Sequence, residues 1–123
     1  MKKLSIVIVT YNASFDVERT LKSVFDQTFA DFEVIIIDGG SKDDTLDIIK
    51  KFEIRIDYCV SEKDRGIYDA MNKGIEASKG EYVQFLNAGD YFVNENVLDE
   101  IFNDCSDQPT LIYGDINILH KLY

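Results

Sequence analysis

The alternation between short apolar runs and longer segments with helical periodicity is the feature that most constrains the fold of this chain. Residues 4–9 (LSIVIV) form an almost continuous apolar run, as expected for a strand covered on both faces. Further strands are predicted at residues 33–37 and 82–86, and another begins at residues 111–113. Residues 54–60 (IRIDYCV) predict a weaker strand, because apolar and polar residues alternate there.

Amphipathic helices are predicted between these strands, because apolar residues recur there at intervals of three and four. Ser41 and Asp44 form a capping-box pattern, so Ser41 is expected to cap the second helix. The order of strands and helices predicts an α/β fold with a mostly parallel sheet, right-handed crossovers and helices on both faces. The four helical stripes consist of Val17, Leu21, Val24 and Phe25; of Thr45, Ile48, Ile49 and Phe52; of Ile67, Ala70, Met71, Gly74 and Ile75; and of Val97, Leu98, Ile101, Phe102 and Cys105.

Length and charge narrow the classes of protein that this chain can represent. With 123 residues it forms one domain at most, and it is long enough to bury a core. A formal net charge of -10 disfavours non-specific nucleic-acid binding, which needs lysine and arginine to displace counterions, so no nucleic-acid partner is expected. Residues 4–9 are too few for a signal or membrane helix, and the chain is expected to be cytoplasmic.

Cysteine and histidine are too few and too scattered for several kinds of site. Cys59 and Cys105 lack metal-ligand spacing, and both are expected to be reduced thiols in or near the core. His120 is the single histidine, which excludes histidine-rich metal sites and argues against a Ser-His-Asp triad.

Polar residues follow every predicted strand at its carboxyl end, which is where open α/β sheets bind ligands. Helix caps and turns use the same residue types, so capping explains any one of these residues as well as binding does. Capping does not require carboxylates after four of five strands, and a ligand site is therefore predicted at this edge. The residues are Thr10, Tyr11 and Asn12; Asp38, Gly39, Gly40 and Ser41; Ser61, Glu62, Asp64 and Arg65; Asn87 and Asp90; and Gly114 and Asp115.

The first of these loops excludes several ligand classes. TYNAS contains no glycine, so the dinucleotide fingerprint is absent, and no GxxxxGK[ST] phosphate loop exists in the chain. A phospho-relay receiver domain needs paired acids after the first strand, and TYNAS has none. The carboxylates are suited either to Mg²⁺ or Mn²⁺ shared with a phosphate-bearing ligand, or to hydrogen bonds from a base or ribose.

Four segments in this order resemble the family 2 glycosyltransferases: LSIVIVTYNA, VIIIDGGSKDDT, GIYDAMNKGIEASKGEYVQFLNAGD and LIYGD. The resemblance spans residues 4 to about 116. It implies the three-layer GT-A nucleotide-diphospho-sugar transferase fold, an inverting reaction, and a nucleotide-sugar donor such as a UDP-sugar. It also implies a glycan or lipid-linked acceptor in surface polysaccharide synthesis, Mg²⁺ or Mn²⁺ as cofactor, and peripheral association of the full-length protein with the inner face of the membrane.

The resemblance also implies roles for individual donor-binding residues. Tyr11 would pack on the base, and Asp38 would accept a hydrogen bond from it, such as the one from N3–H of uracil. Arg65 would face the nucleotide or its phosphates. Met71 stands where many members have arginine, and its place in the apolar stripe favours core packing. The remaining expected donor-binding residues are Thr10, Asn12, Gly40, Ser41, Asp64, Asp69, Asn72, Asn87 and Ala88.

LNAGD stands where the family has its acidic metal motif. Asn87 replaces the first acid and Gly89 a middle one, so Asp90 is the expected metal ligand, together with diphosphate oxygens and water. The family's catalytic base lies beyond residue 123; Asp115 is the one late acid near this edge, and substrate binding or structure explains it better. Residues 1–123 are therefore expected to be one glycosyltransferase domain truncated before its acceptor half. A non-catalytic nucleotide-binding or scaffold module is the alternative.

Overall fold

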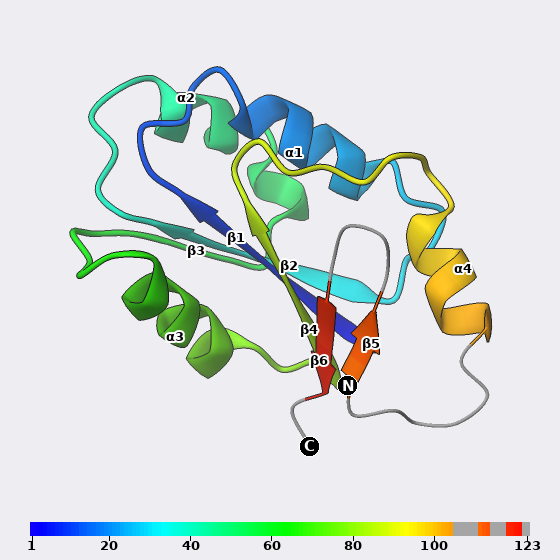
Figure 1. Ribbon diagram of the computed structural model, residues 1–123. Coiled ribbons are helices and arrows are strands. Elements are labelled where there is room, and N and C mark those ends of the chain that lie inside the picture. Colours follow the sequence, from blue (N-terminus) through cyan, green and yellow to red (C-terminus); the bar gives the residue numbers. More distant parts are fainter. Residues whose placement is uncertain (105–110, 114–117, 122–123) are drawn as a thin grey trace.

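The computed structural model describes residues 1–104, 111–113 and 118–121 and has an α/β architecture (Figure 1). One six-stranded sheet has the strand order β3-β2-β1-β4-β6-β5. The first four strands in that order are parallel, whereas β6 pairs antiparallel with β4, and β5 antiparallel with β6. The strands are β1 (Leu4–Thr10), β2 (Phe32–Asp38), β3 (Tyr58–Ser61), β4 (Tyr82–Asn87), β5 (Leu111–Tyr113) and β6 (Ile118–Lys121).

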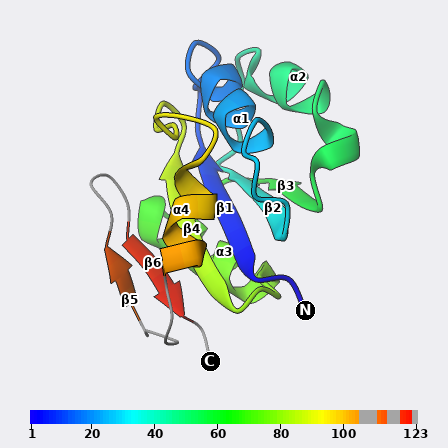
Figure 2. The same ribbon diagram turned by 90° about the vertical axis from the view of Figure 1, so that its right-hand side faces the viewer.

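Helices cover both faces of the sheet and make three layers, as predicted. α1 (Val17–Phe25), α2 (Thr45–Lys50) and α4 (Val97–Asp104) lie on one face, and α3 (Ile67–Ala77) lies on the other (Figures 1 and 2). The two faces have separate apolar clusters, because successive side chains of β1 point to opposite sides. Ile6 and Ile8 pack toward α1 and α4, whereas Val7 belongs to the cluster under α3.

The parallel strands end in register, and this brings their polar carboxyl ends to one edge. Thr10 at the end of β1 pairs with Asp38 at the end of β2, and Asp38 pairs with Ser61 at the end of β3. On the other side of β1, Val9 pairs with Asn87 at the end of β4. We call this border the carboxyl edge of the sheet.

α3 approaches β1 closely, and small residues make the contact. Ala70 and Gly74 are buried, and a Cβ placed on Gly74 would lie 2.3 Å from Cγ1 of Val7. Ile67 and Ile75 belong to the predicted apolar stripe, but both are exposed. Met71 is half-buried. A helix this close to the sheet has room only for small side chains at its centre, and the bulky ones lie at its flanks.

The strand predicted at residues 54–60 is shorter than expected. A 3₁₀ turn, η1 (Glu53–Arg55), occupies its first part, and only residues from Tyr58 onward join the sheet. A side-chain oxygen of Asp57 accepts the N–H of Val34 at 2.8 Å, and the Arg55 guanidinium lies over the Phe25 ring at 4.4 Å. These tertiary contacts prevail over the alternating pattern.

Two further expectations are corrected, and one lies outside the described residues. Ser41 does not cap α2, since Asp44 precedes the helix and the Ser41 hydroxyl is bonded elsewhere. Cys59 is an exposed free thiol on β3, the border strand of the sheet, rather than a core residue. Cys105 lies outside the described residues. Within the described part of the chain, no helix combines the length and the apolar character needed to cross a membrane.

Candidate functional site

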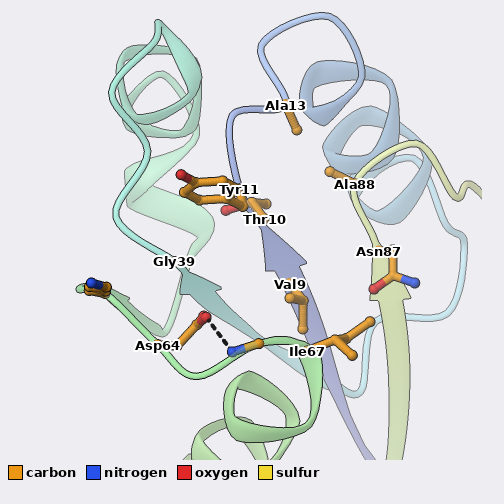
Figure 3. Close-up of a pocket in the computed structure, with 11 residues that line it drawn as sticks. Val9, Thr10, Tyr11, Ala13, Gly39, Asp64, Ile67, Asn87 and Ala88 are labelled. Atoms are coloured by element: carbon orange, nitrogen blue, oxygen red, sulfur yellow. Dashed lines mark hydrogen bonds between the residues drawn. The ribbon is translucent and has the colours of Figure 1, made fainter.

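A pocket of about 520 Å³ opens at the carboxyl edge, between the ends of β1, β2 and β4 (Figure 3). It brings together six of the residues that the sequence singled out: Thr10, Tyr11, Gly39, Asp64, Asn87 and Ala88. The sequence did not indicate the other lining residues, which are Val9, Ala13, Lys63, Gly66 and Ile67. The site therefore lies where open α/β sheets bind ligands.

Tyr11 presents its ring to the pocket. Its side chain follows β1 directly and is 62% exposed, although the strand that precedes it is buried. The loop behind it is fixed by Asn12, which has a left-handed backbone (φ 45°) and a side chain that accepts the N–H of Lys42 at 2.9 Å. An exposed aromatic ring on an anchored loop is a ready surface for stacking.

Asn12 and Ser41 act as loop connectors rather than as lining residues. The N–H of Asn12 donates to the Ser41 hydroxyl at 2.8 Å, and the N–H of Ala13 donates to the hydroxyl of Thr45 at 2.8 Å. These bonds join the loop after β1 to the loop after β2 and to the first residue of α2. Neither Asn12 nor Ser41 lines the pocket, and both contribute by holding Tyr11 and its neighbours in position.

Asp38 is the centre of a buried hydrogen-bond hub. It is 0% exposed, and its two oxygens accept five hydrogen bonds from within the chain. Oδ1 accepts from the hydroxyls of Thr10 and Ser41, both at 2.6 Å. Oδ2 accepts from the N–H groups of Gly40 (3.0 Å) and Ser41 (2.8 Å) and from the Ser61 hydroxyl (2.8 Å). A carboxylate has about four lone-pair sites, so none remains for a ligand.

These internal bonds occupy the oxygens that were expected to accept a hydrogen bond from the base. Burial raises the pKa of Asp38, but the hydrogen bonds from Ser41, Thr10 and Ser61 together outweigh it and hold the pKa below 3.8. The group is therefore a buried anion that is stabilised by hydrogen bonds from internal donors. Gly40, with a φ of 89°, serves the same hub through its N–H group.

The loop between β3 and α3 (residues 62–66) borders the pocket on another side. Oδ1 of Asp64 accepts the N–H of Gly66 at 3.0 Å, and a side-chain oxygen of Asp69 accepts the N–H of Arg65 at 2.9 Å. Asp69 also lies 3.7 Å from the ammonium of Lys73. Asp69 is thus occupied in shaping the loop and does not line the pocket.

Two cations belong to this loop. Lys63 lines the pocket, and Arg65 beside it is exposed. Neither makes an ion pair with another described residue. The one sequence feature that could have indicated Lys63 is its place in the charged stretch SEKDRG, which follows a predicted strand. Asn72 is exposed on α3 and does not line the pocket.

The turn after β4 gives Asp90 a structural role. Its Oδ2 accepts the N–H of Asn87 at 3.0 Å, and its own N–H donates to the carbonyl oxygen of Asn87 at 2.9 Å. Gly89 between them has a φ of 106°, and its N–H donates to the Thr20 hydroxyl at 2.8 Å. Asp90 is exposed, and its Oδ1 accepts no hydrogen bond from the described residues.

A divalent cation would find one strong protein ligand at this turn. Within residues 1–104 and the described strands that follow, no three acidic, cysteine or histidine side chains gather as a complete metal cage. Oδ1 of Asp90 remains available, and the carboxylate of Asp16 lies beside Gly89. Mg²⁺ sites commonly combine one or two carboxylates with substrate phosphates and water, so the turn fits a cation that arrives with its ligand. Asp115 lies outside the described residues.

Sequence comparisons give relatives for this chain. A PGL/p-HBAD biosynthesis glycosyltransferase of Mycobacterium bovis (strain BCG / Pasteur 1173P2) is 35% identical over 117 residues, which cover 91% of this chain and 46% of that protein. The UDP-Glc:alpha-D-GlcNAc-diphosphoundecaprenol beta-1,3-glucosyltransferase WfaP of Escherichia coli is 35% identical, over 82% of this chain and 41% of its own length. The chain therefore spans less than half the length of these relatives.

Solved structures share the fold. S. aureus TarS 1-349 in complex with UDP-GlcNAc superposes with a TM-score of 0.74 and 27% identity, covering 82% of this chain and 30% of that one. A mannosyltransferase of Pyrobaculum calidifontis, solved with GDP-Man and Mn²⁺, gives a TM-score of 0.84 at 18% identity, over 98% of this chain and 44% of that one. The fold is that of the GT-A nucleotide-sugar transferases. Because the family model for glycosyl transferase family 2 also matches residues 5–118, the chain belongs to that family.

Proposed function

We propose that this chain binds the nucleotide-sugar donor of a glycosyltransferase that moves a sugar from a UDP-linked donor to a glycan or lipid-linked acceptor, with inversion at the anomeric carbon. The observation that carries the proposal is the pocket at the carboxyl edge, which combines an exposed aromatic ring, polar groups and a lysine. Two similar proteins support it: WfaP is named for a UDP-Glc donor, and TarS was solved with UDP-GlcNAc.

The two sides of the pocket suit the two ends of a nucleoside diphosphate. Tyr11 offers a ring face to the base, and Asn87 and Ala88 lie across the pocket at the end of β4 (Figure 3). Lys63, with Arg65 beside it, supplies positive charge in a chain whose formal net charge is -10. A ligand with two phosphates needs such charge to enter an acidic edge.

Asp90 is the residue that we propose to hold Mg²⁺ or Mn²⁺. Oδ1 of the exposed Asp90 is a hard oxygen ligand, and we propose that Asn87, whose N–H donates to the same carboxylate, contacts ribose or diphosphate. When bound, the cation stabilises negative charge on the departing diphosphate. The protein's part is to hold the carboxylate still, and the hydrogen bond from the N–H of Asn87 does so.

The acceptor is proposed from relatives alone. WfaP is named for a diphosphoundecaprenol-linked sugar, and the relative TarP of Staphylococcus aureus for poly(ribitol-phosphate). A lipid-linked acceptor would bring the full-length protein to the inner face of the membrane, and we propose peripheral association there.

Asp90→Asn is expected to remove most of the Mn²⁺-dependent gain in UDP affinity while leaving the melting temperature of the free protein almost unchanged. The amide oxygen of asparagine can still accept the N–H of Asn87, so the turn should persist. What disappears is the negative charge that holds the cation. Calorimetric titration of UDP with and without Mn²⁺, on wild type and variant, measures the difference.

Asp31→Asn is the matched control, because it removes the same charge from an exposed residue that precedes β2 at the opposite end of the sheet. Its Mn²⁺-dependent gain should equal that of the wild type. An undiminished gain in Asp90→Asn would leave Asp90 a turn residue only. If the wild-type chain binds no nucleoside diphosphate, the proposed function fails. Binding without release of nucleoside diphosphate from a nucleotide sugar, in a full-length version, would favour a non-catalytic module.

A further inference from the structure

We propose that Asp64, held over Gly39 beside the Tyr11 ring, is the residue that selects the base, and that its one free oxygen selects uracil. This inference rests on the proposed function, because it concerns the nucleotide pocket, but it assigns recognition to a different carboxylate from the one that the sequence suggested. Asp38 accepts five internal hydrogen bonds and has no accessible surface, so it has no free acceptor.

Asp64 and Tyr11 meet above Gly39. If Gly39 carried a Cβ, that atom would lie 3.0 Å from Oδ2 of Asp64, 3.4 Å from its Cγ and 3.3 Å from Cδ1 of Tyr11. All three residues line the same pocket (Figure 3). A base stacked on the Tyr11 ring would therefore present its edge close to a carboxylate oxygen.

Gly39 makes this arrangement possible. Any side chain there would press on Oδ2 of Asp64 at a distance shorter than normal van der Waals contact. Gly39 is held in place from behind, because its N–H donates to the carbonyl oxygen of Thr10 at 2.9 Å. Because Gly39 has no side chain, it leaves the space that the carboxylate of Asp64 occupies.

Only one oxygen of Asp64 is available for recognition. Oδ1 accepts the N–H of Gly66 at 3.0 Å (Figure 3), whereas Oδ2 accepts no hydrogen bond from the described residues. The bond from Gly66 also fixes the orientation of the carboxylate. The backbone of Gly66 has a φ of 111°, which other residues rarely adopt. The pocket therefore offers a single, oriented acceptor.

A single acceptor matches uracil better than the other bases. Uracil has one ring N–H between two carbonyl groups, and that N–H can donate to Oδ2. Guanine has two adjacent donors on its corresponding edge and would need both oxygens of a carboxylate. In cytosine and adenine the amino group stands beside a ring nitrogen lone pair, which a carboxylate repels.

Asp64→Asn should change the preferred base. The N–H of Gly66 still needs an oxygen partner, so the amide would direct its NH₂ group toward the base. That group opposes the N–H of uracil but can donate to the ring nitrogen of cytosine. We expect UDP affinity to fall about tenfold and CDP affinity to rise relative to it, since an unmatched donor costs about as much as a lost hydrogen bond. Calorimetric titrations with UDP, CDP and GDP, all with Mn²⁺, measure the order.

Glu62→Gln is the control, since it makes the same chemical change in the same loop at a residue whose side chain pairs with Lys73 and does not line the pocket. It should keep the wild-type order of bases. An unchanged preference for UDP in Asp64→Asn would overturn the inference and leave the proposed function intact. No binding of any nucleoside diphosphate by the wild type would instead be a failure of the proposed function.

Gly39→Ala tests the same geometry without changing charge, and it decides the matter if Asp64→Asn does not fold. The added methyl group displaces Oδ2 of Asp64 and crowds the Tyr11 ring. UDP affinity should fall, with no gain for CDP, while the thermal unfolding transition stays cooperative. Unchanged UDP affinity in a folded Gly39→Ala protein would contradict the inference.

Discussion

Asp38→Ala is expected to destabilise the protein by about 3–5 kcal/mol, comparable with breaking a buried ion pair. The substitution leaves donors from Thr10, Gly40, Ser41 and Ser61 without their acceptor, and of these residues Thr10 is buried, Gly40 and Ser41 are half-buried and Ser61 is exposed. Each unsatisfied buried donor costs about 1–3 kcal/mol before water or neighbouring groups compensate for part of it. Urea denaturation at neutral pH measures the loss as a lower midpoint at unchanged slope.

Asp38→Asn removes the charge but keeps a hydrogen-bonding side chain, and it should lower the free energy of unfolding by only about 1–2 kcal/mol. The amide oxygen can take the place of Oδ2 and accept the same three donors, while the NH₂ group faces the hydroxyls of Thr10 and Ser41. A hydroxyl can turn and accept, so no group need remain unpaired. The loss is then only the strength that the negative charge adds to these bonds. Equal losses in the two variants would show that the hub contributes little.

The hub also has a consequence for the pH dependence of stability. Because the folded pKa of Asp38 is below the ordinary 3.8, the ionised group stabilises the fold above that value. This contribution is lost as pH falls from 3.8 through the folded pKa. Asp38→Asn should therefore flatten, but not abolish, the acid limb of the stability profile, since hydrogen bonding by Thr45 also lowers the pKa of Asp43.

Gly74→Ala is expected to destabilise the protein by about 2–3 kcal/mol, which is the range for overpacking a tight interface. The new methyl group would lie 2.3 Å from Cγ1 of Val7, and valine has few alternative rotamers with which to move aside. The better helix propensity of alanine, about 1 kcal/mol, offsets only part of the clash. Thermal and urea unfolding of the variant measure the net effect.

A double-mutant cycle with Val7→Ala identifies the clash as the cause. Once the methyl groups of Val7 are gone, the alanine at residue 74 should be tolerated or even stabilising. The coupling free energy between the two substitutions is therefore expected to be large and favourable. If Gly74→Ala costs as much in the Val7→Ala background as in the wild type, the close approach of α3 to β1 is not the reason.

The strands were predictable where apolar runs were long. β1, β2 and β4 begin and end within about a residue of the sequence expectation. The prediction of a strand at residues 54–60 was wrong for its first half, where the sequence alternates only weakly. Contacts of Arg55 with the Phe25 ring and of Asp57 with Val34 hold that half outside the sheet. Similarly, Ser41 matched a local capping pattern, but a buried carboxylate three residues earlier is a better partner for its hydroxyl.

The carboxyl edge was predictable as the location of the site, but the division of tasks among its acids was not. Whether a carboxylate is free depends on donors contributed by other strands. Asp38 accepts hydrogen bonds from Thr10 of β1 and Ser61 of β3, and the sequence around Asp38 predicts neither contact. The position of Asp64 over Gly39 arises in the same way, from two loops that are separated along the chain.

The hydrogen bonds to Asp38 order one side of the pocket more strongly than the side formed by the loop that carries Asp64. The ends of β1 and β3 and the loop after β2 converge on Asp38, so their conformational entropy is already lost before a ligand arrives. A ligand that contacts this rigid floor should bind with little ordering cost from it. The loop that carries Asp64 has fewer such ties, and the entropy change on binding should come mainly from there. Changes in that loop should therefore alter ligand choice with little effect on folding.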